Sequence, residues 1–259
     1  MSDRALVDTN NFSVSKLSGA FLTAPYAIRF ARSNREIIAA QELRFEVFNL
    51  ELHEGLDQSF VSGRDHDVFD DVCDHLIVEY IPTQKVVGTY RMQTGTNAKL
   101  QRGYYCEQEF DFRPYESFRP EIIELGRACV HKQHRNLIVL GLLWKGIADY
   151  AVQKGGRYLL GCSSLTSQDP AVGAAMFAQL YRKYIADLVW RTNPLPDYTC
   201  PTHELHGEPV KIPKLLNAYL MIGARICGPP ALDRQFKTID FLTMLDLKFL
   251  PPAVRQKFF

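Results

Sequence analysis

The first clear pattern along the chain is an alternation of apolar and polar residues followed by a helical repeat. Residues 26–32 alternate well enough to predict a first strand. A capping box follows, in which Ser33 precedes Glu36 by three positions. The helix that starts there has apolar residues at three- and four-residue spacing, which predicts one buried face. That stripe consists of Ile37, Ala40, Leu43, Val47 and Leu50.

An acidic segment without a regular apolar period follows this helix, over residues 51–74. About 24 residues without regular structure inside a domain are typical of a lid or a binding loop. The group Asp65-x-Asp67-x-Phe69-Asp70 lacks the central glycine and the final glutamate of a calcium loop. Two interpretations stay open: a solvated loop, or carboxylates gathered to meet arginines or a substrate ammonium.

Apolar and alternating runs predict the remaining elements. Two strands joined by a hairpin turn are expected at residues 75–81 and 86–93. A short helix is expected around Glu107, and the five prolines of residues 191–213 predict a long loop or flap. The other predicted elements are a strand starting at Glu121, a helix over 137–154 ended by Gly155-Gly156, a strand over 157–163, helices over 170–187 and 214–223, and a last strand over 239–247.

This order of elements predicts one mixed α/β (α+β) domain over residues 26–259. Residues 1–25 show no sustained period and are expected to form an N-terminal arm. The chain contains neither an internal repeat nor a low-complexity linker.

Composition excludes several classes of protein. The 259 residues are 46% hydrophobic and 23% charged, which is enough for a sizeable core. Thirty basic and 29 acidic side chains leave a net charge of +1, which argues against a nucleic-acid-binding protein. The six cysteines form no C-x-x-C pair and indicate a reducing, cytoplasmic location. The most apolar segment, residues 137–144, is too short for a bilayer span, so at most a peripheral contact with the inner face of the membrane is expected.

The stretch that folding alone does not explain is the strand that begins at Glu121. It has a carboxylate, a glycine and an arginine together in its interior, at Glu124, Gly126 and Arg127. A glycine inside a strand indicates a bulge or a close approach of another backbone. The pKa of Glu124 would rise through desolvation and fall beside Arg127, and in either case Glu124 is the best candidate for a general base.

Three arginines, Arg44, Arg91 and Arg127, lie next to large apolar residues within predicted regular structure. A buried arginine is costly unless a carboxylate pairs with it. A structural ion-pair network and a functional cluster are equally consistent with the spacing. The carboxylates that would pair with these arginines are Asp67, Asp70 and Glu124.

A basic turn, His131-Lys132-Gln133-His134-Arg135, precedes the helix over residues 137–154. Helix N-termini favour anions, so this turn is either a phosphate-binding site or solvated surface. No spacing of histidine, cysteine and carboxylate predicts a metal site. The group Cys162-Ser163-Ser164 follows a strand but lacks a nucleophile elbow, and no base can be assigned to it.

Taken together, these pieces resemble a known family. Four ordered blocks look like the signature blocks of acyl-homoserine-lactone synthases: Leu43–Phe48, Asp65–Asp70, Val86–Arg91 and Glu124–Arg127. Two further blocks, Cys73–Leu76 and Gly223–Asp233, are closer to the ornithine-lipid N-acyltransferases and long-chain N-acyl amino acid synthases, which are often labelled haemolysins. All of these proteins have the GNAT-type acyltransferase fold.

The resemblance implies a central mixed, mostly antiparallel sheet, splayed at its middle strand and flanked by helices. It also implies transfer of a long-chain acyl group, 3-hydroxylated in some members, to the amine of ornithine, glycine or another amino acid. The implied donor is the acyl-phosphopantetheine of acyl carrier protein, or acyl-CoA, and no cofactor is bound permanently. The segment from Arg135 to Leu140 has no glycine. That departure from the glycine-rich pyrophosphate loop of coenzyme A enzymes favours the carrier protein.

Site roles follow from the resemblance by motif position. The catalytic residues would be Glu124, Arg127, Arg91 and Asp70. The substrate-binding residues would be Arg44, Asp65, Asp67, Gly126 and Leu125, with Asp65 standing where the family has glutamate. Glu124 would take the amine proton, and a backbone amide at Gly126 would stabilise the oxyanion. The residues expected to meet the carrier protein are Lys132, His134, Arg135 and Lys145. An acyl pocket would be lined from Leu125, Leu142 or Leu160.

Two other functions are considered as alternatives to the N-acyltransferase. One is an acyl-homoserine-lactone-type autoinducer synthase of the same fold, against which the chain has the extra block Gly223–Asp233. The other is a non-enzymatic, membrane-active protein, against which the chain lacks a long amphipathic or apolar span.

Overall fold

A single sheet runs through the computed structural model, which describes residues 15–17, 20–202 and 210–259. Its strands are β1 (Ser15–Leu17), β2 (Ala20–Thr23), β3 (Tyr26–Phe30), β4 (Asp74–Tyr80), β5 (Lys85–Thr94), β6 (Ile122–Val130), β7 (Tyr158–Leu165), β8 (Arg225–Ile226), β9 (Ala231–Asp233) and β10 (Thr238–Asp246). The ten-stranded sheet has the order β1-β2-β3-β4-β5-β6-β7-β10-β8, and β9 pairs with β10. Among these strands, only β6 and β7 pair in parallel, so the sheet is mixed and mostly antiparallel, as predicted.

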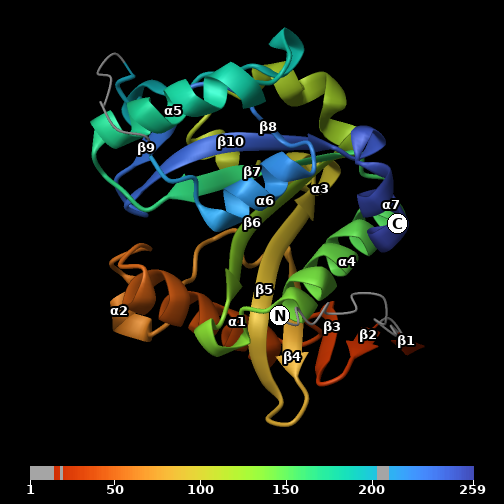
Figure 1. The fold of residues 1–259 in the computed structure, drawn as a ribbon. Helices are drawn as coiled ribbons and strands as arrows, with labels where there is room; N and C mark the ends of the chain where they lie inside the picture. The colour runs from red at the N-terminus through yellow and green to blue at the C-terminus, as the bar shows by residue number, and fades with distance from the viewer. Residues whose placement is uncertain (1–14, 18–19, 203–209) are drawn as a thin grey trace, which may run out of the picture.

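Helices cover both faces of this sheet (Figure 1). The α-helices are α1 (Asn34–Phe45), α2 (Ser59–Ser62), α3 (Gly95–Leu100), α4 (Leu137–Lys154), α5 (Pro170–Tyr184), α6 (Lys214–Met221) and α7 (Pro252–Phe258). A π-helical turn, Glu46–Glu51, continues α1. Short 3₁₀ turns lie at Cys106–Gln108, Arg113–Glu121, Lys132–His134, Leu188–Trp190, Pro196–Tyr198 and Leu247–Phe249. No α-helix within the described ranges combines the length and the apolar character that crossing a bilayer requires.

The core is divided between the two faces. On one face, α4 places Val139, Leu142 and Leu143 against Leu76 and Val78 of β4. Figure 1 shows α4 lying across the front of β4 and β5 in that view. On the other face, α1 and the π-helical turn pack against β6, and the segment that precedes β6 packs against β7 and β10. The middle strands β6 and β7 are therefore covered on both sides.

The two middle strands diverge along their length. Ile122–Glu124 pairs with Tyr158–Leu160, and the β6–β7 ladder ends there. Beyond that point β6 continues along β5, while β7 pairs with β10 over its whole length. A Cβ on Gly161 would lie 2.2 Å from the carbonyl oxygen of Leu125, so only glycine fits where the strands separate. The splayed middle strand that the family resemblance implied is confirmed.

The predicted bulge in β6 is also present. Arg91 pairs with Gly126 and Thr89 with Cys129, so two residues of β6 lie opposite Tyr90 alone. The unusual backbone belongs to Arg127, whose φ of 51° lies in the left-handed region, and not to the glycine. Such a conformation costs an L-residue roughly 1–2 kcal/mol. A Cβ on Gly126 would meet no atom within 4 Å, so that position faces open space.

Some expected elements differ from the structure. Residues 15–17 and 20–23, inside the expected arm, form β1 and β2 and extend the sheet beyond β3. The π-helical turn has more residues per turn than an α-helix, and it moves Leu50 off the apolar stripe to 52% exposure. Helix α7 was not expected. Residues 203–209 of the proline-rich loop lie outside the described residues.

Candidate active site

A ring of three arginines and three aspartates joins the acidic segment to α1, β5 and β6. Arg44, in the last turn of α1, is 0% exposed. Its Nε donates to Asp65 Oδ2 at 2.8 Å, and its Nη1 and Nη2 donate to the two carboxylate oxygens of Asp70 at 2.9 and 2.8 Å. Charged hydrogen bonds with this forked geometry are the strongest that arginine makes. Arg44 thus fixes two carboxylates of the acidic segment at once.

The other two arginines close the ring through Asp67. Arg91 Nη1 lies 2.5 Å from Asp67 Oδ1 and 3.3 Å from Asp70 Oδ1. Arg127 Nη2 lies 2.9 Å from Asp67 Oδ2, and its Nε lies 3.2 Å from Asp65 Oδ2. Each aspartate therefore pairs with two arginines and each arginine with two aspartates. The formal charges balance, so the ring can be buried without a net charge.

The ring shifts the acidities of its members. Burial alone would raise the pKa of Asp70, but Arg44 and Arg91 outweigh burial and hold that pKa well below the ordinary value. At Asp67, burial also raises the pKa, but the charges of Arg91 and Arg127 outweigh burial and lower it. Both carboxylates are thus held ionised, with their lone pairs directed at guanidinium groups. The acidic segment meets arginines, which is one of the two interpretations left open by the sequence.

Glu124 is not a member of the ring. It is 4% exposed, and its carboxylate accepts hydrogen bonds from neutral groups. Gln93 Nε2 donates at 2.7 Å and the backbone amide of Tyr105 at 3.0 Å, both to Oε2. The backbone amide of Cys106 donates to Oε1 at 2.9 Å. Among the described residues Glu124 forms no ion pair, so the expected pairing with Arg127 is wrong and Asp65 takes that place.

The residues expected to line an acyl pocket do not lie together. Leu125 packs with Leu142 in the core cluster on the α4 face of the sheet. Leu160 belongs to the cluster on the opposite face. One channel cannot be lined by all three, because the sheet separates the clusters. Leu125 and Gly126 nevertheless border the point where β6 and β7 separate.

The residues expected to meet a carrier protein are also divided. Lys132 and Arg135 are exposed beside the end of β6, where Arg135 pairs with Glu51 at 2.5 and 2.7 Å. His134 Nδ1 lies 3.0 Å from the hydroxyl of Tyr26. Lys145 is farther along α4, and its Nζ donates to the carbonyl of Phe258 at 3.0 Å. Lys145 therefore contacts the C-terminal helix α7 and lies apart from the basic turn.

The N-terminus of α4 is capped by its own sequence. Asn136 Oδ1 accepts from the backbone amides of Ile138 and Val139, both at 3.0 Å. These amides are among the donors that an anion at a helix N-terminus would use. The cap therefore competes with a phosphate for this helix end.

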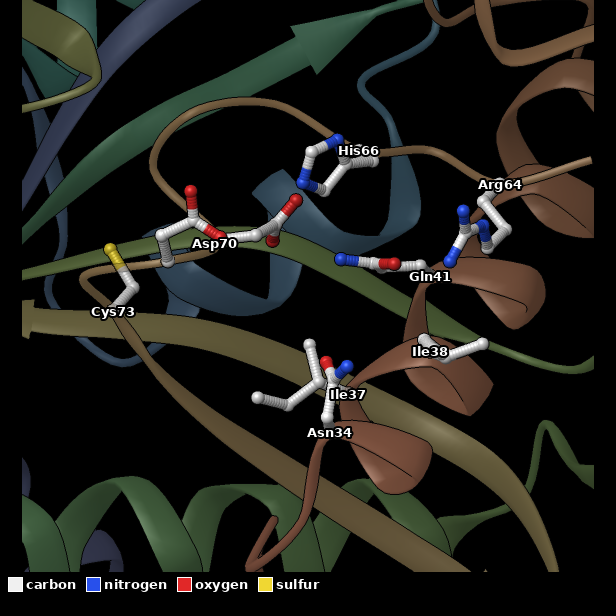
Figure 2. A pocket seen from close by; sticks show the side chains of 9 residues that line it. Asn34, Ile37, Ile38, Gln41, Arg64, His66, Asp70 and Cys73 are labelled. Carbon is white, nitrogen blue, oxygen red and sulfur yellow. The ribbon is translucent and has the colours of Figure 1, made fainter. Parts of the chain in front are cut away.

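A cavity of about 460 Å³ opens beside α1 (Figure 2). Asp70 is the ring member that lines it, and Figure 2 shows its side chain between those of Cys73 and His66. The other lining residues are Asn34, Ile37, Ile38, Gln41, Arg64 and Asp71. The ring therefore borders this cavity through Asp70, whose side chain is itself buried.

Sequence reasoning missed a second buried group of polar residues. Glu109, Cys162 and Asp240 place potential ligand atoms within 4.8 Å of one another, the one such trio found among the described residues. Asp240 carried a usable signal, because a carboxylate interrupts the apolar run of the last strand. Glu109 carried none, since it follows a short 3₁₀ turn in an irregular segment.

Comparison with solved structures agrees with the fold. The acyl-homoserine-lactone synthase LasI superimposes with a TM-score of 0.52 at 11% identity, covering 90% of this chain and 94% of LasI. FeeM, an N-acyl amino acid synthase from uncultured soil microbes, gives a TM-score of 0.51 at 12% identity, with the same coverage. At this identity the likeness concerns the fold alone.

Comparison of sequences goes further. Residues 43–145 match the acetyltransferase (GNAT) domain model. The L-ornithine N(alpha)-acyltransferase of Agrobacterium fabrum is 32% identical over 235 residues, 84% of this chain and 79% of the relative. The protein of the same name from Brucella abortus is 32% identical over 236 residues, 85% of this chain and 84% of the relative. With a splayed GNAT sheet and relatives over most of its length, this chain is an acyltransferase and belongs to the L-ornithine N(alpha)-acyltransferase family.

Proposed function

We propose that this protein transfers a long-chain acyl group from the thioester of acyl carrier protein to the α-amine of ornithine. The observation that carries the proposal is the 32% identity, over about four fifths of the chain, to proteins named for that acceptor and that nitrogen. In the reaction the amine nitrogen attacks the thioester carbonyl, the C–N bond forms and the C–S bond breaks. The amine loses a proton and the carrier thiol gains one.

The gap between β6 and β7 suits an extended donor. Beyond Glu124 the two strands no longer pair, so backbone groups of β6 are available on that side. A phosphopantetheine arm laid along β6 can use them in the manner of an added strand. Gly126 faces open space there, which leaves room for the thioester, and a nearby backbone amide would stabilise the oxyanion.

The ring of arginines and aspartates is proposed to hold the β6 bulge in place, without taking part in bond making itself. Arg127 has a strained backbone at the bulge, and its two ion pairs to Asp65 and Asp67 hold it there. Arg44, Arg91 and Asp70 extend that support to α1 and β5. These residues would fix the bulge beside the reacting carbonyl, which lowers the entropic part of the barrier.

Glu124 remains our predicted general base. Its Oε1 accepts one hydrogen bond, from Cys106, so one lone pair on that oxygen is left for an amine proton or for a bridging water.

The capped start of α4 favours the carrier protein over coenzyme A as donor. In wild type we expect kcat/KM for acyl carrier protein to exceed that for acyl-CoA of the same chain by at least about 100-fold. Asn136→Ala uncovers two helix amides and should narrow that ratio, whereas the matched cap variant Ser33→Ala on α1 should not. Equal use of both donors by wild type would contradict this choice.

The direct test is an acylation assay with purified protein. Acyl carrier protein loaded with a C16 or C18 chain is supplied with ornithine, glycine or S-adenosylmethionine, and products are identified by mass spectrometry. N-acylornithine is the expected product. An acyl-homoserine lactone from S-adenosylmethionine would replace our proposal with the autoinducer synthase, and absence of any acylated amine would remove it. Peripheral membrane contact, also a proposal, is checked by flotation with anionic liposomes.

A further inference from the structure

Two carboxyl groups lie buried together on the side of the sheet opposite α4. Glu109, 1% exposed, follows the 3₁₀ turn Cys106–Gln108, and Asp240, 4% exposed, belongs to β10. Glu109 Oε1 and Asp240 Oδ1 accept no hydrogen bond from an N–H group or a hydroxyl of the described residues. The two carboxyl groups instead hydrogen-bond to each other, which requires a proton between them. A shared proton between buried carboxyl groups marks a place where a positively charged donor would fit.

The protein supplies no cation to this pair. Among the described residues, neither Glu109 nor Asp240 forms an ion pair with a lysine, arginine or histidine. Arg127 attracts Glu109, but its ion pairs go to Asp65 and Asp67. Burial and the neighbouring Asp240 raise the pKa of Glu109 well above its ordinary value, and burial raises the pKa of Asp240 to about 6. The pair therefore holds a proton, because no positively charged side chain of the described residues is paired with it to stabilise two ionised carboxylates.

The pair lies close to the gap between β6 and β7. Cys162 is the residue after Gly161, where the strands separate, and its Sγ lies 3.8 Å from Glu109 Oε2. Asp240 is on the neighbouring strand, paired with Ser164. A molecule whose amine reaches a thioester at the gap can therefore extend toward these two carboxyl groups.

We propose that Glu109 and Asp240 bind the side-chain ammonium of a diamino-acid acceptor and so select it over monoamino acids. The inference rests on the proposed function. An ammonium offers three N–H donors and no acceptor, which matches the two oxygens that accept no hydrogen bond from a described N–H group or hydroxyl. The reacting amine must be neutral to attack the thioester, whereas a buried carboxylate pair favours a cation. The non-reacting nitrogen therefore fits this site.

A metal ion is the competing occupant. Glu109, Cys162 and Asp240 offer two carboxylates and a sulfur, which are ligands that transition metals accept. A metal would also displace the protons of these groups on binding. The metal content of the purified protein decides between the two occupants.

The test compares ornithine with norvaline, which has the same carbon chain without the ammonium. Wild type should show a kcat/KM for ornithine at least about 100-fold above that for norvaline. In Glu109→Gln and Asp240→Asn, ornithine should lose about 100-fold while norvaline changes little. Glu107→Gln removes a carboxylate two residues before Glu109, within the 3₁₀ turn that Glu109 follows, and this matched control should keep the wild-type ratio. Urea unfolding confirms that both variants remain folded.

Several results would overturn the inference. Wild type with no preference for ornithine, or a Glu109→Gln variant that keeps the preference, excludes the ammonium site while N-acyl transfer stands. A stoichiometric metal lost from both variants assigns the group to a metal instead. Calorimetric titration of the protein without acyl donor, with ornithine and with norvaline, tests the ammonium site independently of acyl transfer. Ornithine binding that both variants lose supports the site even if no amine is acylated, and equal binding of the two amino acids refutes it.

Discussion

The guanidinium of Arg44 spans both carboxylate oxygens of Asp70, at 2.9 and 2.8 Å, with 1% of each side chain exposed. The two residues are 26 positions apart, one at the end of α1 and the other in the acidic segment. Their pairing brings that segment against the sheet, and the same Asp70 lines the cavity beside α1. One contact thus links the stability of the fold to the shape of a site.

Replacing Arg44 with methionine should lower the free energy of unfolding, measured by urea denaturation, by about 3–5 kcal/mol. Removal of one partner leaves the buried carboxylates of Asp65 and Asp70 without compensation, and that penalty is larger than the loss of the pair itself. The control is Arg113→Met, which breaks an ion pair in solvent and should leave stability unchanged. A similar small effect in both variants would show that the ring does not carry stability.

Stability should depend on pH through Glu54. Burial raises the pKa of Glu54 to about 7, although Thr166 donates a hydrogen bond to it. Because the folded state binds this proton more tightly than the unfolded state, Glu54 costs stability as the pH rises from about 4.5 through 7. Relative to wild type, Glu54→Gln should gain about 2 kcal/mol more at pH 8 than at pH 5. A difference between the two proteins that is constant with pH would exclude a raised pKa.

At low pH the ring should have the opposite effect. The arginines hold the pKa of Asp67 and Asp70 below ordinary values, so these groups stabilise the fold above the unfolded pKa of about 4. That stability is lost as the pH falls through their folded pKa values. Urea midpoints measured from pH 5 to pH 2 should fall steeply in wild type and less in Arg44→Met, whose ring is already broken. Parallel curves would contradict this.

Glu124→Gln should reduce both stability and turnover. Glutamine has one acceptor oxygen where the carboxylate uses two, so at least one donor among Gln93, Tyr105 and Cys106 is left unmet, at about 1–3 kcal/mol. Loss of a general base adds a fall in kcat of about 100-fold or more. Gln93→Met keeps the carboxylate but removes the donor to Glu124, together with the hydrogen bonds of Gln93 to Gly103 and Asn97. If that variant loses as much turnover as Glu124→Gln, Glu124 acts by holding the turn and not as a base.

Arg127→Gly should be more stable than Arg127→Ala, by about 1 kcal/mol. Both substitutions remove the same ion pairs, but only glycine adopts a φ of 51° without strain. The neighbouring strand provides the matched pair, because Arg91 borders the bulge but pairs with His75 of β4 and has no positive φ. There Arg91→Ala should be the more stable of the two, since glycine weakens a strand interior. The same order at both positions would show that the bulge is not strained.

The sequence by itself determined the elements and much of their order. Asn136 and Gly155 delimit α4, which begins and ends where the pattern predicts, and Gly155 has the left-handed φ of 69° expected of a helix end. Hydrophobic periodicity and capping are local, so a single sequence reports them well. The ordered blocks also indicated the family, and the positions of the ring members followed from them.

Only the tertiary structure decided which of these residues contact one another. The sequence predicted Glu124 as a partner of the arginines, but the ring contains Asp65 in its place. Glu124 instead accepts hydrogen bonds from the turn at Tyr105 and Cys106. The tertiary structure also places Lys145 against α7, apart from the basic turn. Glu109 and Asp240, more than a hundred residues apart, meet because the segment before β6 folds over β7 and β10. Periodicity predicts which face a side chain takes, but a contact between distant segments depends on how the layers pack, and packing is a property of the whole chain.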